Sequence, residues 1–236
     1  MYFDLIIIGS GPGGYVAAIR GAQLGLNVAI IEKEALGGIC LNWGCIPTKS
    51  FLRSAEVLKI IESSEKYGIK SKVGHIDIRE VVKRSRSIAK KLSSGVKYLL
   101  EKNKVKIFFG EASFASSKSL KITSKNNMTQ EISSKSICIA TGGRPREISG
   151  IPISNKLWFY KEALQVDNIP NKLLVVGSGA IGVEFASFFA QMGSDVSILE
   201  SKPTILPNED IEVSNFVERH FSNRGIKIYK DHSLLS

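Results

Sequence analysis

The sequence predicts an α/β chain in which one strand–turn–helix–strand pattern occurs twice. First, an apolar run ending in a glycine-rich turn, residues 3–14, is repeated at residues 172–182. Second, the match continues in register beyond the glycines, pairing Gln23 with Gln191, Gly25 with Gly193, Val28 with Val196 and Glu32 with Glu200. Third, each turn opens a helix with small residues on one side, Ala17, Ala18 and Ala22 or Ala186 and Ala190. Such βαβ starts are typical of Rossmann-like dinucleotide-binding domains, so two are predicted.

The glycines in both copies have the spacing and the context that a dinucleotide site needs. The first permits a tight turn, the second lets the backbone approach a pyrophosphate, and the third lets the helix pack on the strand. An acid after the second strand accepts hydrogen bonds from a ribose diol. The predicted binding residues are Gly9, Gly11, Gly14 and Glu32 in the first copy, and Gly177, Gly179, Gly182 and Glu200 in the second. Because Glu200 would repel a 2′-phosphate, the second site is expected to favour NAD over NADP, with Lys202 close enough to weaken that preference.

Length and composition indicate a soluble globular protein. The 236 residues are 43% hydrophobic and 23% charged, enough for one large or two ordinary domains. The apolar start, residues 1–8, lacks a basic segment and a cleavage site, and no run approaches the roughly 20 apolar residues of a membrane span. With only three cysteines and no disulfide framework, we expect a cytoplasmic protein or one in an equivalent reducing compartment.

The net charge of +10 is concentrated in one helical segment and its end. The basic residues there are Arg79, Lys83, Arg84, Arg86, Lys90, Lys91, Lys97, Lys102 and Lys104. They interleave with an apolar face, which favours a solvated helix surface, and docking of an acidic partner is the alternative. No zinc spacing or RNA-reading signature is present, so nucleic acid and membrane partners are not expected.

The region between the two copies predicts helices and then strands. Pro47 is expected to begin a helix through about Tyr67, and Asp77 with Glu80 resembles a capping box that opens a second helix. Predicted strands run over residues 105–109, 120–123 and 132–140, with a hairpin turn at residues 126–127. Cys138 falls in the last strand and is interpreted as a core residue.

Cys40 and Cys45 form the strongest chemical signal in the chain. Two cysteines five positions apart in a reducing compartment indicate redox or metal chemistry, and the scattered histidines make a zinc site the weaker choice. Cys45 stands just before Pro47, where the positive end of a helix favours a thiolate. Nearby glycines let the chain turn closely beside a flat cofactor. A structural disulfide remains the alternative.

The segment GGICLNWGCIPTK, residues 37–49, resembles the active-site segment of the pyridine nucleotide–disulfide oxidoreductases, and its form is similar to the branch that oxidises dihydrolipoamide. Residues 140–142 resemble the second flavin-side motif of that family, residues 110–112 a backbone contact to FAD, and residues 177–184 its NAD motif. The resemblance covers the chain from end to end.

The resemblance implies a role for each matching residue. Cys40 is the thiol that exchanges with the substrate's sulfurs, Cys45 is the thiolate against the flavin, and Lys49 approaches the flavin and pairs with Glu184. FAD is held by Gly9, Gly11, Gly14, Glu32, Gly38, Lys49, Ala112, Thr141 and Gly142, and NAD by Gly177, Gly179, Gly182, Glu184 and Glu200. The implied reaction is oxidation of dihydrolipoamide to lipoamide with FAD as carrier and NAD as acceptor. The implied partners are a lipoyl domain of a 2-oxo acid dehydrogenase complex and, in full-length members, a second subunit.

The resemblance also implies two incomplete domains, an FAD-binding domain over residues 1–147 and an NAD-binding domain over residues 148–236. Family members are about twice as long and carry a histidine–glutamate base in a C-terminal dimerisation domain. His75 and Glu80 have the same offset, but we interpret them as a surface residue and a helix cap. The chain is therefore expected to be an N-terminal portion, inactive alone. The alternatives are a non-catalytic nucleotide-binding module and a glutathione- or mercuric-type reductase.

Overall fold

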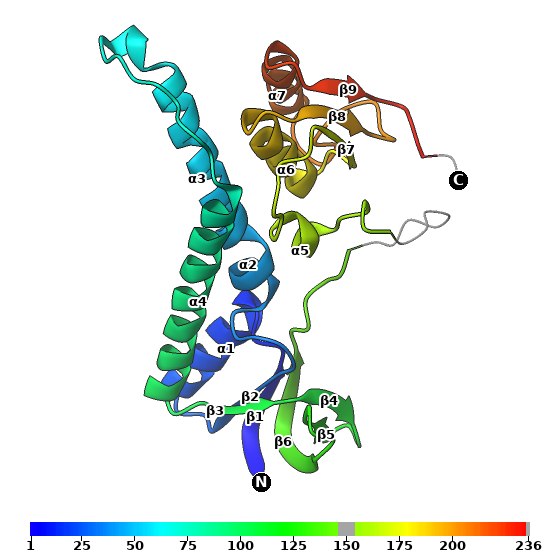
Figure 1. Cartoon of the computed structure of the whole chain (residues 1–236). Helices are drawn as coiled ribbons and strands as arrows, with labels where there is room; N and C mark the ends of the chain where they lie inside the picture. The colour runs from blue at the N-terminus through cyan, green and yellow to red at the C-terminus, as the bar shows by residue number, and fades with distance from the viewer. Residues whose placement is uncertain (146–153, 235–236) are drawn as a thin grey trace. The chain divides into compact units, whose positions relative to one another are not determined.

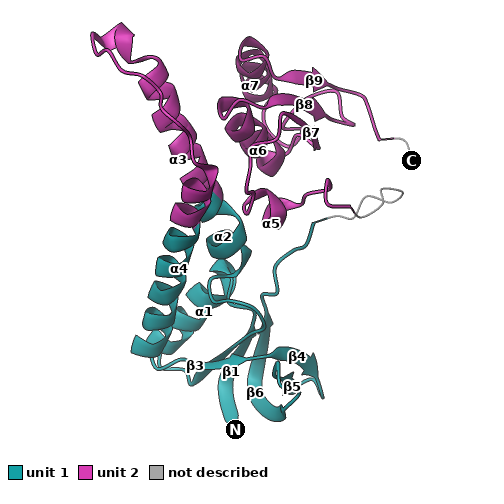
Figure 2. Cartoon of the chain, in the orientation of Figure 1, with its two compact units in different colours: residues 1–47, 86–145 teal, residues 48–85, 146–236 magenta. Residues whose placement is uncertain are grey.

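The computed structural model of the chain describes residues 1–145 and 154–234, which form two compact units (Figure 2). Unit 1 comprises residues 1–47 and 86–145, and unit 2 comprises residues 48–85 and 146–236. The predicted boundary between residues 147 and 148 lies outside the described residues. The helical segment 48–85 belongs to the same compact unit as the second glycine turn, and the two predicted cofactor domains stay a prediction.

Unit 1 is built on a six-stranded sheet with the order β3-β2-β1-β6-β5-β4. The strands β1, β2, β3 and β6 are parallel, whereas β4 and β5 continue the sheet in antiparallel pairs. The elements of this unit are β1 (Tyr2–Ile8), α1 (Pro12–Gln23), β2 (Val28–Glu32), α2 (Gly38–Trp43), β3 (Lys106–Phe109), β4 (Glu111–Phe114), β5 (Ser119–Thr123) and β6 (Thr129–Ile139). Two longer helices, α3 (Cys45–Glu62) and α4 (Ile78–Lys102), each continue from one compact unit into the other (Figure 1).

The central strands of unit 1 are buried on both faces. Ile7 and Ile30 pack with Ala18 of α1 and Leu100 of α4, so these two helices cover one face of the sheet. The alternate residues of β1 and β2, such as Ile6 and Ile31, form a second cluster that also contains Leu120 and Ile122 of β5. A strand that is buried on both faces has apolar residues at successive positions, and residues 5–8 and 28–31 are such apolar runs in the sequence.

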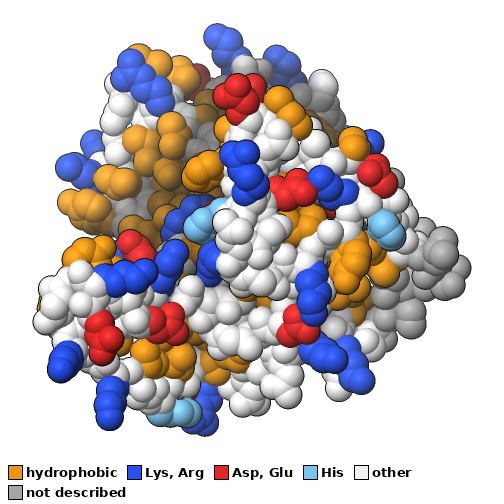
Figure 3. Space-filling view, turned by 90° about the horizontal axis from the view of Figure 1, so that it is seen from above, with side chains coloured by type: hydrophobic (Ala, Val, Ile, Leu, Met, Phe, Trp, Pro, Cys, Tyr) orange, Lys and Arg blue, Asp and Glu red, His pale blue; other side chains and the backbone are white. Residues whose placement is uncertain are grey.

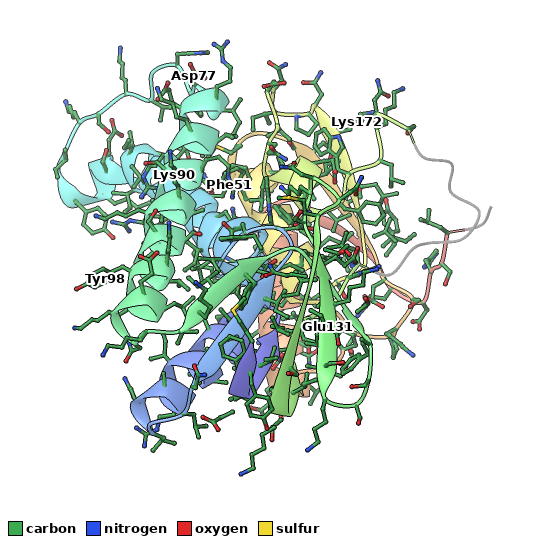
Figure 4. The ribbon with its side chains drawn as sticks, turned by 90° about the horizontal axis from the view of Figure 1, so that it is seen from below. Phe51, Asp77, Lys90, Tyr98, Glu131 and Lys172 are labelled. Carbon is green, nitrogen blue, oxygen red and sulfur yellow. The ribbon has the colours of Figure 1, made fainter. Side chains whose placement is uncertain are left out.

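Unit 2 repeats the same start on a smaller sheet. Its three strands are parallel in the order β7-β8-β9, and its large core is centred on Phe188 and Phe189 of α6. Phe51 of α3, labelled in Figure 4, is fully buried against Phe188 with ring centroids 4.7 Å apart. The other elements are η1 (Ser64–Tyr67), α5 (Tyr160–Ala163), β7 (Lys172–Val176), α6 (Ala180–Gln191), β8 (Asp195–Leu199), α7 (Ile211–Asn223) and β9 (Lys227–Tyr229).

The predicted mixed α/β class with two βαβ starts is confirmed, and the element bounds differ in a few places. Helix α3 begins at Cys45 rather than Pro47 and ends at Glu62, and the 3-10 turn η1 follows it. Helix α2 and strand β4 were not expected, because six or four residues are too short for a periodic pattern. The hairpin turn at residues 126–127 is present, with Asn127 in the left-handed region at φ 59°.

The basic helix α4 is strongly amphipathic, with an exposed face that includes Lys90 and Tyr98 (Figure 4). In the view of Figure 3, basic side chains are interspersed with acidic and apolar ones. The expectation of a solvated surface is wrong for Arg86. Its guanidinium carbon lies 4.2 Å from the ring centroid of Trp43, and its Nε and Nη2 are buried without a hydrogen-bond partner. The aromatic face stabilises this buried cation, because a ring quadrupole attracts positive charge.

The Asp77 cap gives a first testable prediction. The backbone N–H of Arg79 donates to Asp77 Oδ1 at 2.9 Å at the start of α4, and hydrogen bonds from the side chain and backbone of Arg79 lower the pKa of Asp77. Glu80 pairs with Lys83. Asp77→Ala should lower the melting temperature by a few degrees, and Asp77→Asn by less, since asparagine also caps helices. The contribution of the Asp77 charge to stability is present above the ordinary aspartate pKa and is lost as the pH falls through the lowered value. The difference in melting temperature between Asp77→Ala and the parent chain should therefore be smaller at pH 3 than at pH 7. Equal melting temperatures for Asp77→Ala and the parent chain at pH 7 would contradict the capping role.

Candidate active site

The first glycine turn is closed by direct backbone contacts. Gly9 has φ +98°, and a Cβ there would lie 2.4 Å from the carbonyl oxygen of Ala140. A Cβ on Gly14 would lie 1.9 Å from the carbonyl oxygen of Gly9. Strands β1 and β6 are paired up to Ile8 and Ile139, so both end beside this turn. A ligand site is expected at the carboxyl ends of parallel strands where the strand order reverses, which is this position.

The start of α1 fits a bound pyrophosphate. Gly11 is the N-cap residue of α1, and no side chain caps the free amide groups of the first helical turn. A Cβ on Gly11 or on Gly13 would meet nothing within 4 Å, so the space in front of these amides is open. Uncapped amides at a positive helix end bind phosphate, and the residues present therefore fit the adenine dinucleotide that the sequence implies.

Ser10 holds the predicted ribose-binding acid, Glu32, in a fixed position. The backbone N–H and the hydroxyl of Ser10 both donate to Glu32 Oε2, at 3.0 and 2.6 Å. The backbone N–H of Glu34 donates to the other oxygen, Oε1, at 2.8 Å. Glu32 is only 8% exposed, so these donors replace the water that its carboxyl group loses on burial. Each oxygen retains capacity for a further donor, such as a ribose hydroxyl.

The second turn reproduces this arrangement in unit 2. A Cβ on Gly182 would lie 2.0 Å from the carbonyl oxygen of Gly177, whereas one on Gly179 would meet nothing within 4 Å. The N–H and hydroxyl of Ser178 donate to Glu200 Oε2 at 2.8 and 2.6 Å. Burial raises the pKa of Glu200, but the hydrogen bonds from Ser178, Lys202 and Ser201 outweigh it and hold the pKa below the ordinary glutamate value.

The cysteine segment lies against the first glycine turn in unit 1. The N–H of Gly37 donates to the carbonyl oxygen of Ser10 at 3.0 Å. Gly38 has φ +62°, and a Cβ there would lie 2.6 Å from Gly11 Cα, so the two backbones are in contact. Cys40, on α2, is half-buried, and Cys45, the first residue of α3, is exposed. The segment that carries both thiols is thereby fixed next to the predicted phosphate site.

Gly44 stands directly before Cys45 and lies close to the backbone of Cys40. It connects α2 to α3, and a Cβ there would lie 3.3 Å from Cys40 Cα and 3.1 Å from the carbonyl oxygen of Ile39. The backbone just before Cys45 therefore folds back on the backbone of Cys40. A Cβ at position 44 would require these neighbours to shift by a few tenths of an ångström.

Lys49 and Glu184, predicted as partners, are in contact within unit 2. Lys49 Nζ lies 2.5 Å from Glu184 Oε1. Because 60% of the Lys49 side chain is exposed, the pair contributes at most about 1 kcal/mol to stability. The adjacent contact of Phe51 with Phe188 fixes α3 on α6, and so the ion pair is positioned by the core rather than by its own attraction.

The remaining predicted residues lie in unit 1. Thr141 follows β6, with its Cα 3.1 Å from the Cβ position of Gly9, and Gly142 follows it with φ +72°. Ala112 lies on β4 opposite Ile122, and β4 begins just after Gly110, whose N–H donates to the carbonyl oxygen of Glu32. The binding roles of these three residues stay predictions. His75 is exposed, and Cys138 packs, half-buried, with one core cluster.

Comparison with known proteins assigns the class. The family model described as pyridine nucleotide-disulphide oxidoreductase matches residues 3–235, and the chain belongs to this family. It is 49% identical over 234 residues to the dihydrolipoyl dehydrogenase of Zymomonas mobilis and 46% identical to that of Rhizobium etli. These matches cover 99% and 96% of this chain and 50% of each relative, so the chain spans about half the length of the curated relatives it matches.

A solved structure shares the fold. The HOCl-induced flavoprotein disulfide reductase RclA of Escherichia coli, as its Cu(II) complex, superposes with a TM-score of 0.83 at 28% identity. The match covers 99% of this chain and 50% of that one. Membership of the family confirms the predicted cofactor classes, FAD and a nicotinamide dinucleotide. Within the described residues, no helix is both long enough and apolar enough to cross a bilayer.

Proposed function

We propose that this chain provides the FAD site, the NAD site and the redox-active dithiol of a dihydrolipoyl dehydrogenase. The observation that carries the proposal is the contact between the Gly38 backbone and the Gly11 backbone, which places the cysteine segment beside an open dinucleotide turn. Relatives with the same name at 38–49% identity support it. The binding and catalytic roles of the individual residues belong to the proposal.

The chain's own residues would act as follows. Cys40 and Cys45 are present as thiols in the structure, which corresponds to the reduced form of the pair. In the oxidised form they would be joined by a disulfide, which opens to two thiols as the dithiol of dihydrolipoamide gives up two electrons and two protons and closes to lipoamide. Cys40 would exchange with the substrate sulfurs, and Cys45, the first residue of α3, would be the thiol that faces the flavin. FAD, when bound, would accept two electrons from this dithiol and pass them to NAD. The family resemblance implies that Lys49, which is paired with Glu184, tunes the electronics of the flavin ring.

NAD is favoured over NADP because Glu200 is ionised and held in place. A 2′-phosphate would meet this carboxylate, which accepts from the backbone N–H of Lys202 at 2.9 Å on Oε1. This observation disfavours a glutathione- or mercuric-type reductase, which prefers NADPH. The lipoyl-domain substrate, the 2-oxo acid dehydrogenase complex, pairing with a second subunit and a cytoplasmic location are parts of the same proposal.

The visible absorption spectrum of the purified chain with added FAD tests the proposal. After stoichiometric dithiothreitol, we expect a long-wavelength band that arises from a thiolate against the flavin ring. Cys45→Ser should abolish this band completely, whereas Cys40→Ser should show it without reductant, because Cys45 then has no disulfide partner. Cys138→Ser is the matched control and should behave as the parent chain.

Two outcomes would count against the proposal. Bound flavin whose spectrum does not respond to dithiothreitol would leave a nucleotide-binding module without redox function. A band that survives Cys45→Ser would exclude Cys45 as the thiolate. Formation of NADH from dihydrolipoamide, followed at 340 nm on the same samples, tests the separate prediction that these 236 residues are inactive alone.

A further inference from the structure

The serine between the first two glycines of each turn makes the same set of contacts in both units. Ser10 and Ser178 are fully buried, and each donates through its backbone N–H and through its hydroxyl to one carboxylate oxygen. The hydroxyl contact is 2.6 Å in both copies. Chance turn geometry does not explain two buried serines that each direct the same two donors to the same oxygen of the acid.

Each serine also holds the loop that follows its acid. The carbonyl oxygen of Ser10 accepts from the N–H of Gly37, and that of Ser178 accepts from the N–H of Leu206, each at 3.0 Å. The serine thereby connects the glycine turn, the acid and the following loop. In unit 1 this loop leads directly into the cysteine segment.

The contacts restrict the carboxylate in charge and in orientation. Glu200 is 6% exposed, and its second oxygen accepts from the Lys202 N–H at 2.9 Å and from the Ser201 hydroxyl at 3.3 Å. A buried carboxylate with donors on both oxygens stays ionised, and rotation away from Ser178 would leave buried donors unpaired.

We propose that Ser10 and Ser178 are positioning residues that fix the two ribose-binding acids in one orientation and thereby make each site select an adenosine ribose without a 2′-phosphate. This inference rests on the proposed function, because it requires that the two glycine turns bind dinucleotides. An acid that could turn away or take up a proton would tolerate a 2′-phosphate. Both acids are held by their serines and cannot turn away, and the lowered pKa of Glu200 keeps that acid charged, so a 2′-phosphate at the second site meets a fixed negative charge.

Other titratable groups near Glu200 do not replace the serine. Tyr229 and His232 are in contact with Glu200 through the backbone, as acceptor from the Glu200 N–H and as donor to the Glu200 carbonyl oxygen. The side chain of Lys202 is exposed. Among the described groups, the lowered pKa of Glu200 is due to hydrogen bonds from Ser178, Lys202 and Ser201.

Calorimetric binding and NMR titration test the inference on the full 236-residue chain. The probes are ADP-ribose and its 2′-phosphorylated form, and ¹³C-labelled glutamate gives the Glu200 titration, assigned with Glu200→Gln. Ser178→Ala should weaken ADP-ribose binding at the second site about tenfold and shrink the preference over the phosphorylated probe by a similar factor. It should also raise the pKa of Glu200. Ser10→Ala is the matched control, because it removes the same hydroxyl in unit 1 and should leave the Glu200 titration unchanged.

The outcomes separate the inference from the function on which it rests. A parent chain that binds neither probe contradicts the proposed dinucleotide site. A parent chain that prefers ADP-ribose, together with a Ser178→Ala variant of unchanged preference and unchanged Glu200 titration, overturns the role of the serine alone. If Ser178→Ala does not fold, the NMR titration of Glu200 in the parent chain still tests the inference. A Glu200 pKa at or above the ordinary glutamate value would overturn it, because the acid would then not be held in its ionised form.

Discussion

Gly14→Ala is expected to destabilise the chain by about 3 kcal/mol or more, a large effect for one methyl group. The new Cβ would lie 1.9 Å from the carbonyl oxygen of Gly9 and 2.9 Å from its carbon. Both are backbone atoms of the tight turn, so no side-chain rotation relieves the clash, and α1 has to move away from β1. Urea denaturation followed by circular dichroism should show a lower midpoint with a similar slope.

Gly13→Ala is the matched control for this prediction. Gly13 is the neighbouring residue on α1, and a Cβ there would meet nothing within 4 Å. Its stability should be unchanged or higher by up to about 1 kcal/mol, because alanine favours a helix over glycine. Similar losses for both variants would contradict the prediction, because helix propensity favours alanine at both positions and only Gly14 has a backbone atom in the way of a Cβ. Gly182→Ala repeats the test in unit 2, where the corresponding distance is 2.0 Å.

The repeated pattern was predictable because the same strand, glycine turn, helix and second strand occur in both units. The turn requires glycine at positions where a Cβ would collide with its backbone, as at Gly14 and Gly182. The second strand of each copy is followed by an acid, and both residue types are visible in the sequence. Ser10 and Ser178 were not singled out, since serine is common in turns for many reasons. The signal was nevertheless available, because serine occupies the same place in both copies.

Other features depend on contacts between residues far apart in the chain. The association of residues 48–85 with the second glycine turn rests on pairs such as Phe51 with Phe188 and Glu62 with Gln191, which no local pattern indicates. Arg86 looked like one more solvated charge of a basic helix, and only the position of the Trp43 ring shows otherwise. Helix α2 is bounded by glycines on both sides and is too short for a helical period to be recognised.

Gly179→Ala is expected to leave the fold intact and to weaken nucleotide binding about 100-fold. Gly179 has φ −67°, an angle that alanine adopts freely, and a Cβ there would meet nothing within 4 Å of the protein. Stability should therefore change by less than about 0.5 kcal/mol. The same Cβ would stand in the space through which a pyrophosphate reaches the uncapped amides of α6, and this is the reason for the loss of binding.

Calorimetry with ADP-ribose measures the effect, and Gly95→Ala on α4, another position with open space, should bind as the parent chain does. Unchanged ADP-ribose affinity in Gly179→Ala would mean that phosphate does not approach this turn. The contrast with Gly182→Ala then distinguishes the glycine that the fold requires from the glycine that the ligand requires.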